Sequence, residues 1–290
     1  MFLKKVSLIL ATALLAFSLT GCGGGDKKAD SGKDGKAAAA KTLVFGCQMY
    51  ADGGIDPSAQ TNTAWNCSRY GVGQTLFRFD DNVKPVPQLA ESATPSDGNK
   101  TWTFKLKKGI KFSNGTEMTA TKVKEYLDWI REAGKKGSST PHKFLDAEAV
   151  VTADDAAGTI VIKSKKAYPD MAASLADPCM VILDVKGSKD LKNGAIGTGP
   201  YMLKGDGVTD KSGWEESVQY TLVRNPYYWG EAPYYDEFDV RFYSQESTRY
   251  CNYSKDKFGG EITFIKPAKL EEGTPEYEAW AKAMENAERS

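Results

Sequence analysis

The feature that most constrains the fold of this chain is a strict alternation of apolar and polar side chains near residue 100. The alternation follows the turn-forming run Ser96–Lys100 and consists of Trp102-Thr103-Phe104-Lys105-Leu106-Lys107. A period of two predicts a strand with one face in the core and the other in water. The pair Asp97-Gly98 before it favours a hairpin turn.

A helical pattern follows this strand. Four apolar residues between Val123 and Ile130 recur at the spacing of one helix face, and Thr119 precedes them as a candidate cap. Two further apolar runs, Val150-Val151 and Ile160-Val161-Ile162, flank a polar turn and predict a second hairpin. Together these elements predict an α+β fold with mixed β-sheets.

The remaining elements are expected from shorter patterns. The apolar run Thr42–Cys47 predicts a buried strand, and a helical pattern covers residues 65–76. A short helix is expected over Tyr168–Ala176, with Pro169 in its first turn. Further strands are expected near residues 180–185, 218–224 and 236–243. A last short helix begins at Thr274 as cap, with Pro275 in its first turn, and ends near Glu288.

The composition excludes several function classes. The 290 residues carry 38 basic and 38 acidic side chains, so no charge excess points to nucleic acid as a partner. The single histidine, His142, lies in a loop-like stretch and is expected in solvent rather than on a metal. No nucleophile, zinc-protease or phosphate-loop motif is present, so we expect no enzyme, no catalytic residue, no metal and no cofactor.

The first 22 residues have the features of a targeting signal. Lys4 and Lys5 precede the apolar run Val6–Phe17, which is too short to span a bilayer comfortably. Leu19-Thr20-Gly21-Cys22 then resembles a bacterial lipobox, in which the cysteine is acylated on sulfur. This predicts lipidation of Cys22 and an exported protein anchored to the cell membrane, facing the periplasm or the exterior; an ordinary secretory signal with a chance cysteine is the alternative.

Residues 23–41 are expected to form a flexible tether. Glycine, alanine, lysine and aspartate dominate the segment, which leaves almost nothing to enter a core. A flexible chain of this length has a root-mean-square reach of about 25 Å. The tether therefore allows a folded body to meet a partner in the same membrane.

Four cysteines remain beyond the signal: Cys47, Cys67, Cys179 and Cys251. Their spacings fit neither a CxxC pair nor a zinc site. A Cys47–Cys67 bridge is conceivable in an exported protein. We expect separate, partly buried thiols instead.

Six sequence blocks resemble, in order and spacing, the extracellular solute-binding proteins of the peptide/nickel ABC importer family, family 5. They are Leu76–Asp81, Pro87–Ser92, Lys100–Leu106, Gly109–Thr116, Gly197–Tyr201 and Leu222–Gly230. The resemblance implies a periplasmic-binding-protein-like (type II) lobe over residues 42–250. It also implies a receptor that closes two lobes on a small-molecule or peptide ligand and docks on an ABC permease in the membrane.

The resemblance implies one ligand-facing segment after the first strand. In peptide binders, the residues that follow an Asp-Pro pair run beside the bound peptide; here Asp56-Pro57 precede Thr61, Asn62 and Thr63. Their backbone groups are expected to pair with an extended ligand as strands do; a surface loop without ligand contact is the alternative. Trp65 is expected either as an apolar wall of the ligand site or as a core residue.

A second ligand-facing segment is implied at Asp177-Pro178-Cys179. In nickel-binding relatives an arginine stands just before this proline and grips a carboxylate of the metallophore, whereas this chain has Asp177. A carboxylate there would repel an anionic chelator and attract an ammonium group. The alternative is that Asp177 only caps the turn. We therefore expect Asp177 and Cys179 to face the ligand, and peptides rather than nickel chelates to be the cargo.

The chain departs from the family after about residue 250. Full members are nearly twice as long, and residues 251–290 form a divergent tail in which the second lobe has no counterpart. We expect a truncated product rather than a specialised single-lobe form, because a half-cleft leaves ligand-facing groups in water. Three functions thus stay open: peptide capture, metal-chelate capture on the same fold, and a surface lipoprotein for adhesion or scaffolding.

Overall fold

The computed structural model describes residues 41–47, 54–136 and 145–242, and parts of a C-terminal helix at 273–275, 277–278 and 281–282. The signal with Cys22, nearly all of the tether, His142 and Cys251 lie outside the described residues. Within the C-terminal helix, the backbone N–H of Tyr277 donates to the Thr274 hydroxyl at 3.2 Å, as a helix cap requires.

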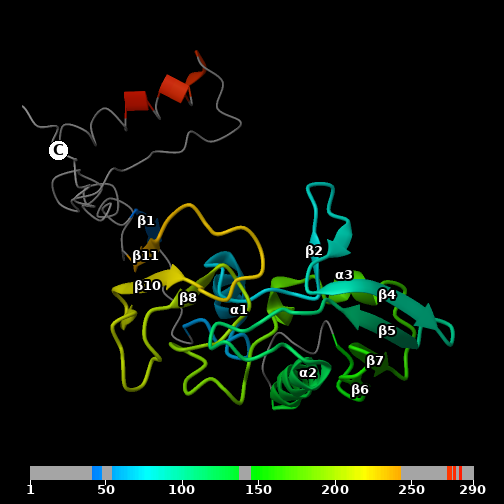
Figure 1. Cartoon of the computed structure of the whole chain (residues 1–290). Coiled ribbons are helices and arrows are strands. Elements are labelled where there is room, and N and C mark those ends of the chain that lie inside the picture. The colour runs from blue at the N-terminus through cyan, green and yellow to red at the C-terminus, as the bar shows by residue number, and fades with distance from the viewer. Residues whose placement is uncertain are drawn as a thin grey trace, which may run out of the picture. The chain divides into compact units, whose positions relative to one another are not determined.

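The first sheet is mixed. Its strands lie in the order β1 (Thr42–Cys47), β11 (Glu237–Phe242), β10 (Gln219–Arg224) and β8 (Tyr201–Leu203), and the short β9 (Trp214–Glu215) also pairs with β10. β1 runs parallel to β11, whereas the other pairs are antiparallel. The expected mixed α+β architecture is confirmed (Figure 1).

The second sheet is antiparallel throughout. It has the order β4 (Ala90–Ser96), β5 (Thr101–Leu106), β7 (Thr159–Lys163) and β6 (Val150–Asp154). The alternation of β5 is confirmed, because Trp102, Phe104 and Leu106 are buried and the residues between them are not. A separate small hairpin joins β2 (Phe77–Phe79) to β3 (Pro85–Pro87).

Helix α2 (Ala120–Lys135) packs against β6 and β7 (Figure 1). Its cap is Thr119, as predicted: the Thr119 hydroxyl accepts a hydrogen bond from the backbone N–H of Lys122 at 3.3 Å. Its apolar face is fully buried in a core shared with both sheets. Within the described residues, every helix is too short or too polar to cross a membrane.

Two expectations around residues 168–185 are wrong. Helix α3 spans only Met171–Ser174 and is capped by Asp170, so Pro169 precedes the cap instead of lying in the first turn. The predicted strand at 180–185 is replaced by the 3₁₀ turn η2 (Pro178–Met180) and by isolated bridges at Ile182 and Leu183. The run is apolar because it crosses the core, and a buried segment of this kind has no sequence period that would identify a strand.

Two further expectations need correction at the start of the fold. Among the described strands, β1 lies at the end of the first sheet instead of inside it, and 42% of Phe45 is exposed. Helix α1 spans Thr61–Arg69 instead of lying within 65–76. It ends early because Gly71 adopts a positive φ of 73°, which stops a helix and suits glycine.

Candidate functional site

A candidate ligand site lies at the carboxyl ends of the two parallel strands of the first sheet, β1 and β11. β1 and β11 are in register, so Cys47 and Phe242 lie opposite each other at their carboxyl ends. In open α/β sheets, ligands bind at the carboxyl ends of parallel strands. The chain continues from β1 towards α1, and α1 packs against η2. The structure therefore brings together the two segments that were expected to face a ligand.

The first of these segments is helical, which contradicts the expected mode of ligand contact. Thr61, Asn62 and Thr63 form the first turn of α1, and a helical backbone cannot pair with a ligand as a strand does. Thr63 is buried, and its hydroxyl donates to the carbonyl of Gln60 at 2.7 Å and also to that of Asp56. Thr63 thus fixes the start of the helix.

One face of α1 remains in contact with solvent. Its exposed residues are Thr61, Asn62, Trp65 and Arg69, which recur at helical spacing; we call them the α1 stripe. The exposed fraction of Trp65 is 43%, so the core interpretation of this residue is wrong. An exposed indole beside polar side chains offers a flat apolar surface for a ligand.

The second segment places a carboxylate at the start of η2. The Asp177 side chain accepts a hydrogen bond from the backbone N–H of Cys179 at 2.9 Å, so it caps the turn. Asp177 is half-buried, which leaves part of it accessible to a charged ligand. Cys179 has an exposed fraction of only 1%, and its side chain is therefore turned into the core, against expectation.

The cysteine side chains do not form a reactive or metal-binding cluster among the described residues. Cys47, Cys67 and Cys179 are not joined in a disulfide bond. Burial raises the pKa of the Cys67 thiol well above its usual value, which keeps the thiol protonated and unreactive. Among the residues that the structure describes, no group of three or more histidine, cysteine or acidic side chains is placed to hold a metal ion.

Residues of two family-like blocks, Gly197–Tyr201 and Leu222–Gly230, contact the loop that follows α1. Gln74 was not singled out from sequence; its side-chain oxygen accepts from the indole N–H of Trp229 at 2.9 Å and from the Thr198 hydroxyl at 3.2 Å. Gly197 permits close contact of two backbones, because a Cβ there would lie 2.0 Å from the carbonyl oxygen of Val72. These contacts join the loop after α1 to the segment that leads into β8 and, through Trp229, to the segment that follows β10.

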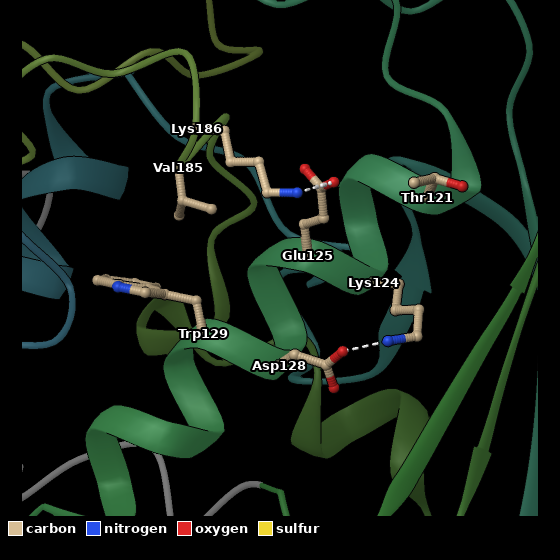
Figure 2. A pocket seen from close by; sticks show the side chains of 7 residues that line it. All are labelled: Thr121, Lys124, Glu125, Asp128, Trp129, Val185 and Lys186. Atoms are coloured by element: carbon tan, nitrogen blue, oxygen red, sulfur yellow. Dashed lines mark hydrogen bonds and ion pairs between the residues drawn. The ribbon is translucent and has the colours of Figure 1, made fainter.

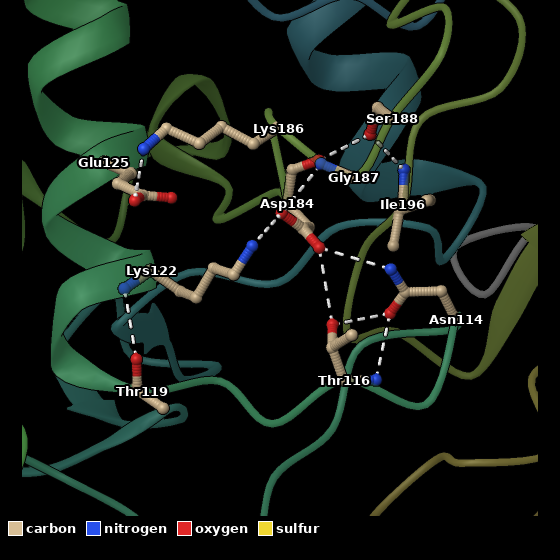
Figure 3. A network of polar contacts seen from close by, with 10 residues as sticks. All are labelled: Asn114, Thr116, Thr119, Lys122, Glu125, Asp184, Lys186, Gly187, Ser188 and Ile196. Atoms are coloured by element: carbon tan, nitrogen blue, oxygen red, sulfur yellow. Dashed lines mark hydrogen bonds and ion pairs between the residues drawn. The ribbon is translucent and has the colours of Figure 1, made fainter.

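A buried carboxylate was also missed from sequence. The side chain of Asp184 is 1% exposed and bonds to the Lys122 ammonium at 2.7 Å, as Figure 3 shows. The backbone N–H of Gly187 (3.0 Å) and the side chains of Asn114 (3.2 Å) and Thr116 (3.3 Å) also donate to it. Burial opposes ionisation, but these donors outweigh it and hold the pKa of Asp184 below its usual value.

The Asp184 network connects segments that are distant in the sequence. It links α2, the loop before α2 and the buried run after η2 (Figure 3). No sequence period marks such a residue, since its partners lie up to 70 positions away.

A hollow of about 580 Å³ lies along α2 and the segment Val185-Lys186 (Figure 2). Its charged side chains form ion pairs, Lys186 with Glu125 Oε1 at 2.6 Å and Lys124 with Asp128, while Glu125 Oε2 is buried without a hydrogen-bond partner. None of the residues predicted to face a ligand lines it. The hollow is therefore distinct from the site at α1 and η2.

Comparison with known proteins shows the family to which the sequence is similar. A family model described as bacterial extracellular solute-binding proteins, family 5 Middle, matches residues 84–272. The nickel-binding protein NikA of Staphylococcus aureus is 29% identical over 190 residues, which cover 65% of this chain and 35% of that protein. Protein XP55 of Streptomyces lividans is 30% identical over 225 residues, covering 74% and 38%. The glutathione-binding protein GsiB of Escherichia coli K12 is 28% identical over 225 residues, covering 76% and 41%.

Solved structures agree with these relatives. NikA from Staphylococcus aureus in complex with Ni(L-His)2 matches with a TM-score of 0.62 and 27% identity, over 73% of this chain and 41% of that one. A nickel ABC transporter structure from Bacillus halodurans matches with a TM-score of 0.62 and 28% identity, over the same shares. The chain thus spans about two-fifths of the length of these structures and of the curated relatives.

Proposed function

The chain belongs to the bacterial extracellular solute-binding proteins of family 5, and we propose that it is a lipid-anchored receptor lobe that captures di- and oligopeptides for an ABC importer. The observation that carries the choice of peptides is the carboxylate of Asp177 at the start of η2, a turn that packs against α1.

Asp177 suits the amino terminus of a peptide. Its carboxylate is positioned by the N–H of Cys179 and is half-buried, so a ligand ammonium would meet a fixed negative charge in a partly desolvated place. The same charge would repel an anionic chelator. The α1 stripe adds polar side chains and the face of Trp65, against which a peptide side chain can pack.

A single lobe supplies one wall of a cleft, and affinity depends on how much of the ligand is buried. We therefore expect binding by this chain alone to be weak, with a dissociation constant near the millimolar range, about −4 kcal/mol. Hinge closure, delivery to an ABC permease and acylation of Cys22 belong to the same proposal. They follow from the family and from the lipobox-like segment Leu19–Cys22.

Nickel-chelate capture is the second candidate, because two of the matched proteins carry nickel in their names. It predicts a different ligand response. A nickel–histidine complex would bind, and the loss of the Asp177 charge would strengthen that binding or leave it unchanged.

The test is a titration followed by the indole N–H resonance of Trp65, assigned with a Trp65→Phe variant. We expect tri-alanine to shift this resonance, N-acetyl-tri-alanine to shift it much less, and Asp177→Asn to weaken tri-alanine binding about 3–10-fold. Asp170→Asn is the matched control, because Asp170 caps α3 through a bond of 2.9 Å to the backbone N–H of Ala173. A response to nickel–histidine with none to tri-alanine would replace peptides by metal chelates.

A further inference from the structure

We propose that the connection between β10 and β11 is a membrane-docking surface, which holds the folded body against the anionic lipid bilayer to which the chain is tethered. The connection covers residues 225–236, and Figure 1 shows it as the orange arch that leaves β10 and returns to β11. We call it the aromatic arch. The proposal rests on the membrane anchor proposed above and adds a second contact with the same membrane.

The aromatic arch exposes large aromatic side chains. Among its twelve residues, five are aromatic: Tyr227, Tyr228, Trp229, Tyr234 and Tyr235. The exposed fraction is 45% for Tyr227, 37% for Trp229 and 65% for Tyr234. Tyrosine and tryptophan combine an apolar ring with a polar end, and they are therefore enriched where a membrane meets water. The composition of the aromatic arch suits this interface.

Each of the three exposed rings has a lysine ammonium over its face. The pairs, measured from the ammonium nitrogen to the ring centroid, are Lys111 with Tyr227 at 5.9 Å, Lys107 with Trp229 at 4.7 Å and Lys41 with Tyr234 at 4.1 Å. All three lie within the range of a cation–π contact. A ring that enters the headgroup layer therefore brings with it a cation that can reach a lipid phosphate.

Basic side chains outnumber acidic ones at this surface. The basic residues in the aromatic arch or next to it are Lys41, Lys107, Lys108, Lys111 and Arg224, and the acidic ones are Glu117, Glu231 and Asp236. The surface thus has an excess of two positive charges on a chain whose formal net charge is zero. Each lysine at an anionic membrane surface strengthens binding about fivefold.

The aromatic arch is held in place by the body. The Trp229 indole N–H donates to the buried side chain of Gln74 at 2.9 Å. The guanidinium of Arg224 donates to the carbonyl of Tyr234 at 2.8 Å and to that of Tyr235 at 3.1 Å. A surface whose side chains are positioned in advance loses little conformational freedom on binding.

The bilayer is the occupant that the position of the tether favours. Lys41 is the last residue of the tether, and its backbone N–H donates to the carboxylate of Asp236 at 2.8 Å, at the end of the aromatic arch. Its carbonyl accepts from the backbone N–H of Asp236 at 2.8 Å. The tether has a reach of about 25 Å. Acylation of Cys22 would therefore keep this part of the body close to lipid.

Docking through the aromatic arch leaves the candidate ligand site accessible. β1 and β11 are parallel and in register, with Thr42 opposite Glu237 at one end and Cys47 opposite Phe242 at the other. The aromatic arch leads into the Glu237 end, whereas the candidate ligand site lies at the Phe242 end. The bilayer and the captured solute thus contact opposite ends of the same two strands.

Hydroxyl-radical footprinting of the full chain on lipid vesicles tests the surface. Vesicles of phosphatidylcholine and phosphatidylglycerol in equal parts are compared with vesicles of phosphatidylcholine alone, and oxidised residues are quantified by mass spectrometry. We expect the oxidation of Trp229 and Tyr234 to fall about threefold on the anionic vesicles. Trp65, which is 43% exposed on the α1 stripe, should be oxidised equally on both.

A pair of double variants tests the role of the lysines. Lys107→Gln with Lys111→Gln removes two cations from the aromatic rings, and Lys165→Gln with Lys166→Gln removes the same charge from the exposed loop after β7. Threefold protection corresponds to about two docked bodies for each undocked one, and the loss of two lysines lowers this ratio about 25-fold. The first variant should therefore lose the protection, and the second should keep it.

Equal oxidation of Trp229 and Tyr234 on the two kinds of vesicle would overturn the proposal. An equal loss of protection in both double variants would also overturn it, because net charge alone would then explain the attraction. The intact mass of the isolated chain reports acylation of Cys22 separately. Protection in a chain without acyl groups would refute the anchor and support docking, whereas an acylated chain without protection would do the reverse.

Discussion

The buried carboxylate of Asp184 gives the sharpest stability prediction. Replacing it by asparagine keeps the shape but removes the charge that Lys122 neutralises at 2.7 Å. In either orientation, the NH2 group of the new amide would face a hydrogen-bond donor. On one side lie the Lys122 ammonium and the N–H of Gly187, and on the other lies the side-chain NH2 of Asn114. Breaking a buried ion pair costs about 3–5 kcal/mol. Lys122 is 27% exposed and stays partly hydrated, so we expect a loss of about 2–4 kcal/mol.

Urea unfolding of the native chain and of Asp184→Asn at several pH values is the assay. The pKa of Asp184 is lowered in the folded chain, so its contribution is complete above the unfolded value near 3.8 and disappears as the pH falls through the folded value. The difference between the two proteins should therefore be constant from pH 7 to about pH 5 and should shrink below about pH 4.

Asp128→Asn is the control on the same helix. Asp128 pairs with Arg131 at 2.8 Å and with Lys124, but its side chain is 30% exposed, so its loss should cost at most about 1 kcal/mol. A cost for Asp184→Asn no larger than that of the control, or a difference that persists unchanged at pH 2, would refute the reasoning.

Three other changes test separate parts of the account. Gly197→Ala should destabilise the chain by at least about 2 kcal/mol in thermal unfolding, because its Cβ would lie 2.0 Å from a backbone oxygen. Gly98→Ala is the comparison without a clash: its Cβ meets no atom within 4 Å, so only the strain of its φ of 61°, about 1 kcal/mol, should appear. Val83→Gly should stabilise the chain by about 1 kcal/mol in urea, since this exposed β-branched residue has a φ of 61°; a loss of stability would contradict that strain. Cys22→Ala should abolish incorporation of labelled fatty acid and release the protein from membranes, and an unchanged membrane fraction would contradict acylation at this residue.

Local sequence patterns predicted the elements whose partners are near in sequence. The alternation around Phe104, the helix capped by Thr119 and the hairpin of β6 and β7 all show a clear period, and each is present. The burial of Met180–Leu183 and the edge position of β1 depend on which distant strands lie beside them, and no local period reports that.

The ligand contacts of the candidate site stay a prediction, whereas the packing of its elements is observed. Motif resemblance indicated the segments at Thr61 and Asp177, and the structure packs their elements together. It did not reveal that Thr63 and Cys179 turn inwards, because the packing of α1 and η2 decides which side of each element faces water. Gln74 and Asp184 were missed because their roles come from bonds to residues far away in sequence.

The most direct test of the account is to map where a peptide contacts the protein. A tripeptide with a free amino terminus and a photoreactive diazirine side chain would be irradiated with the purified chain, and the labelled residues would be identified by mass spectrometry. The account predicts labels on the α1 stripe and next to Asp177, suppressed by excess tri-alanine. Labels confined to the hollow along α2, at Lys124, Trp129 or Lys186, would contradict it.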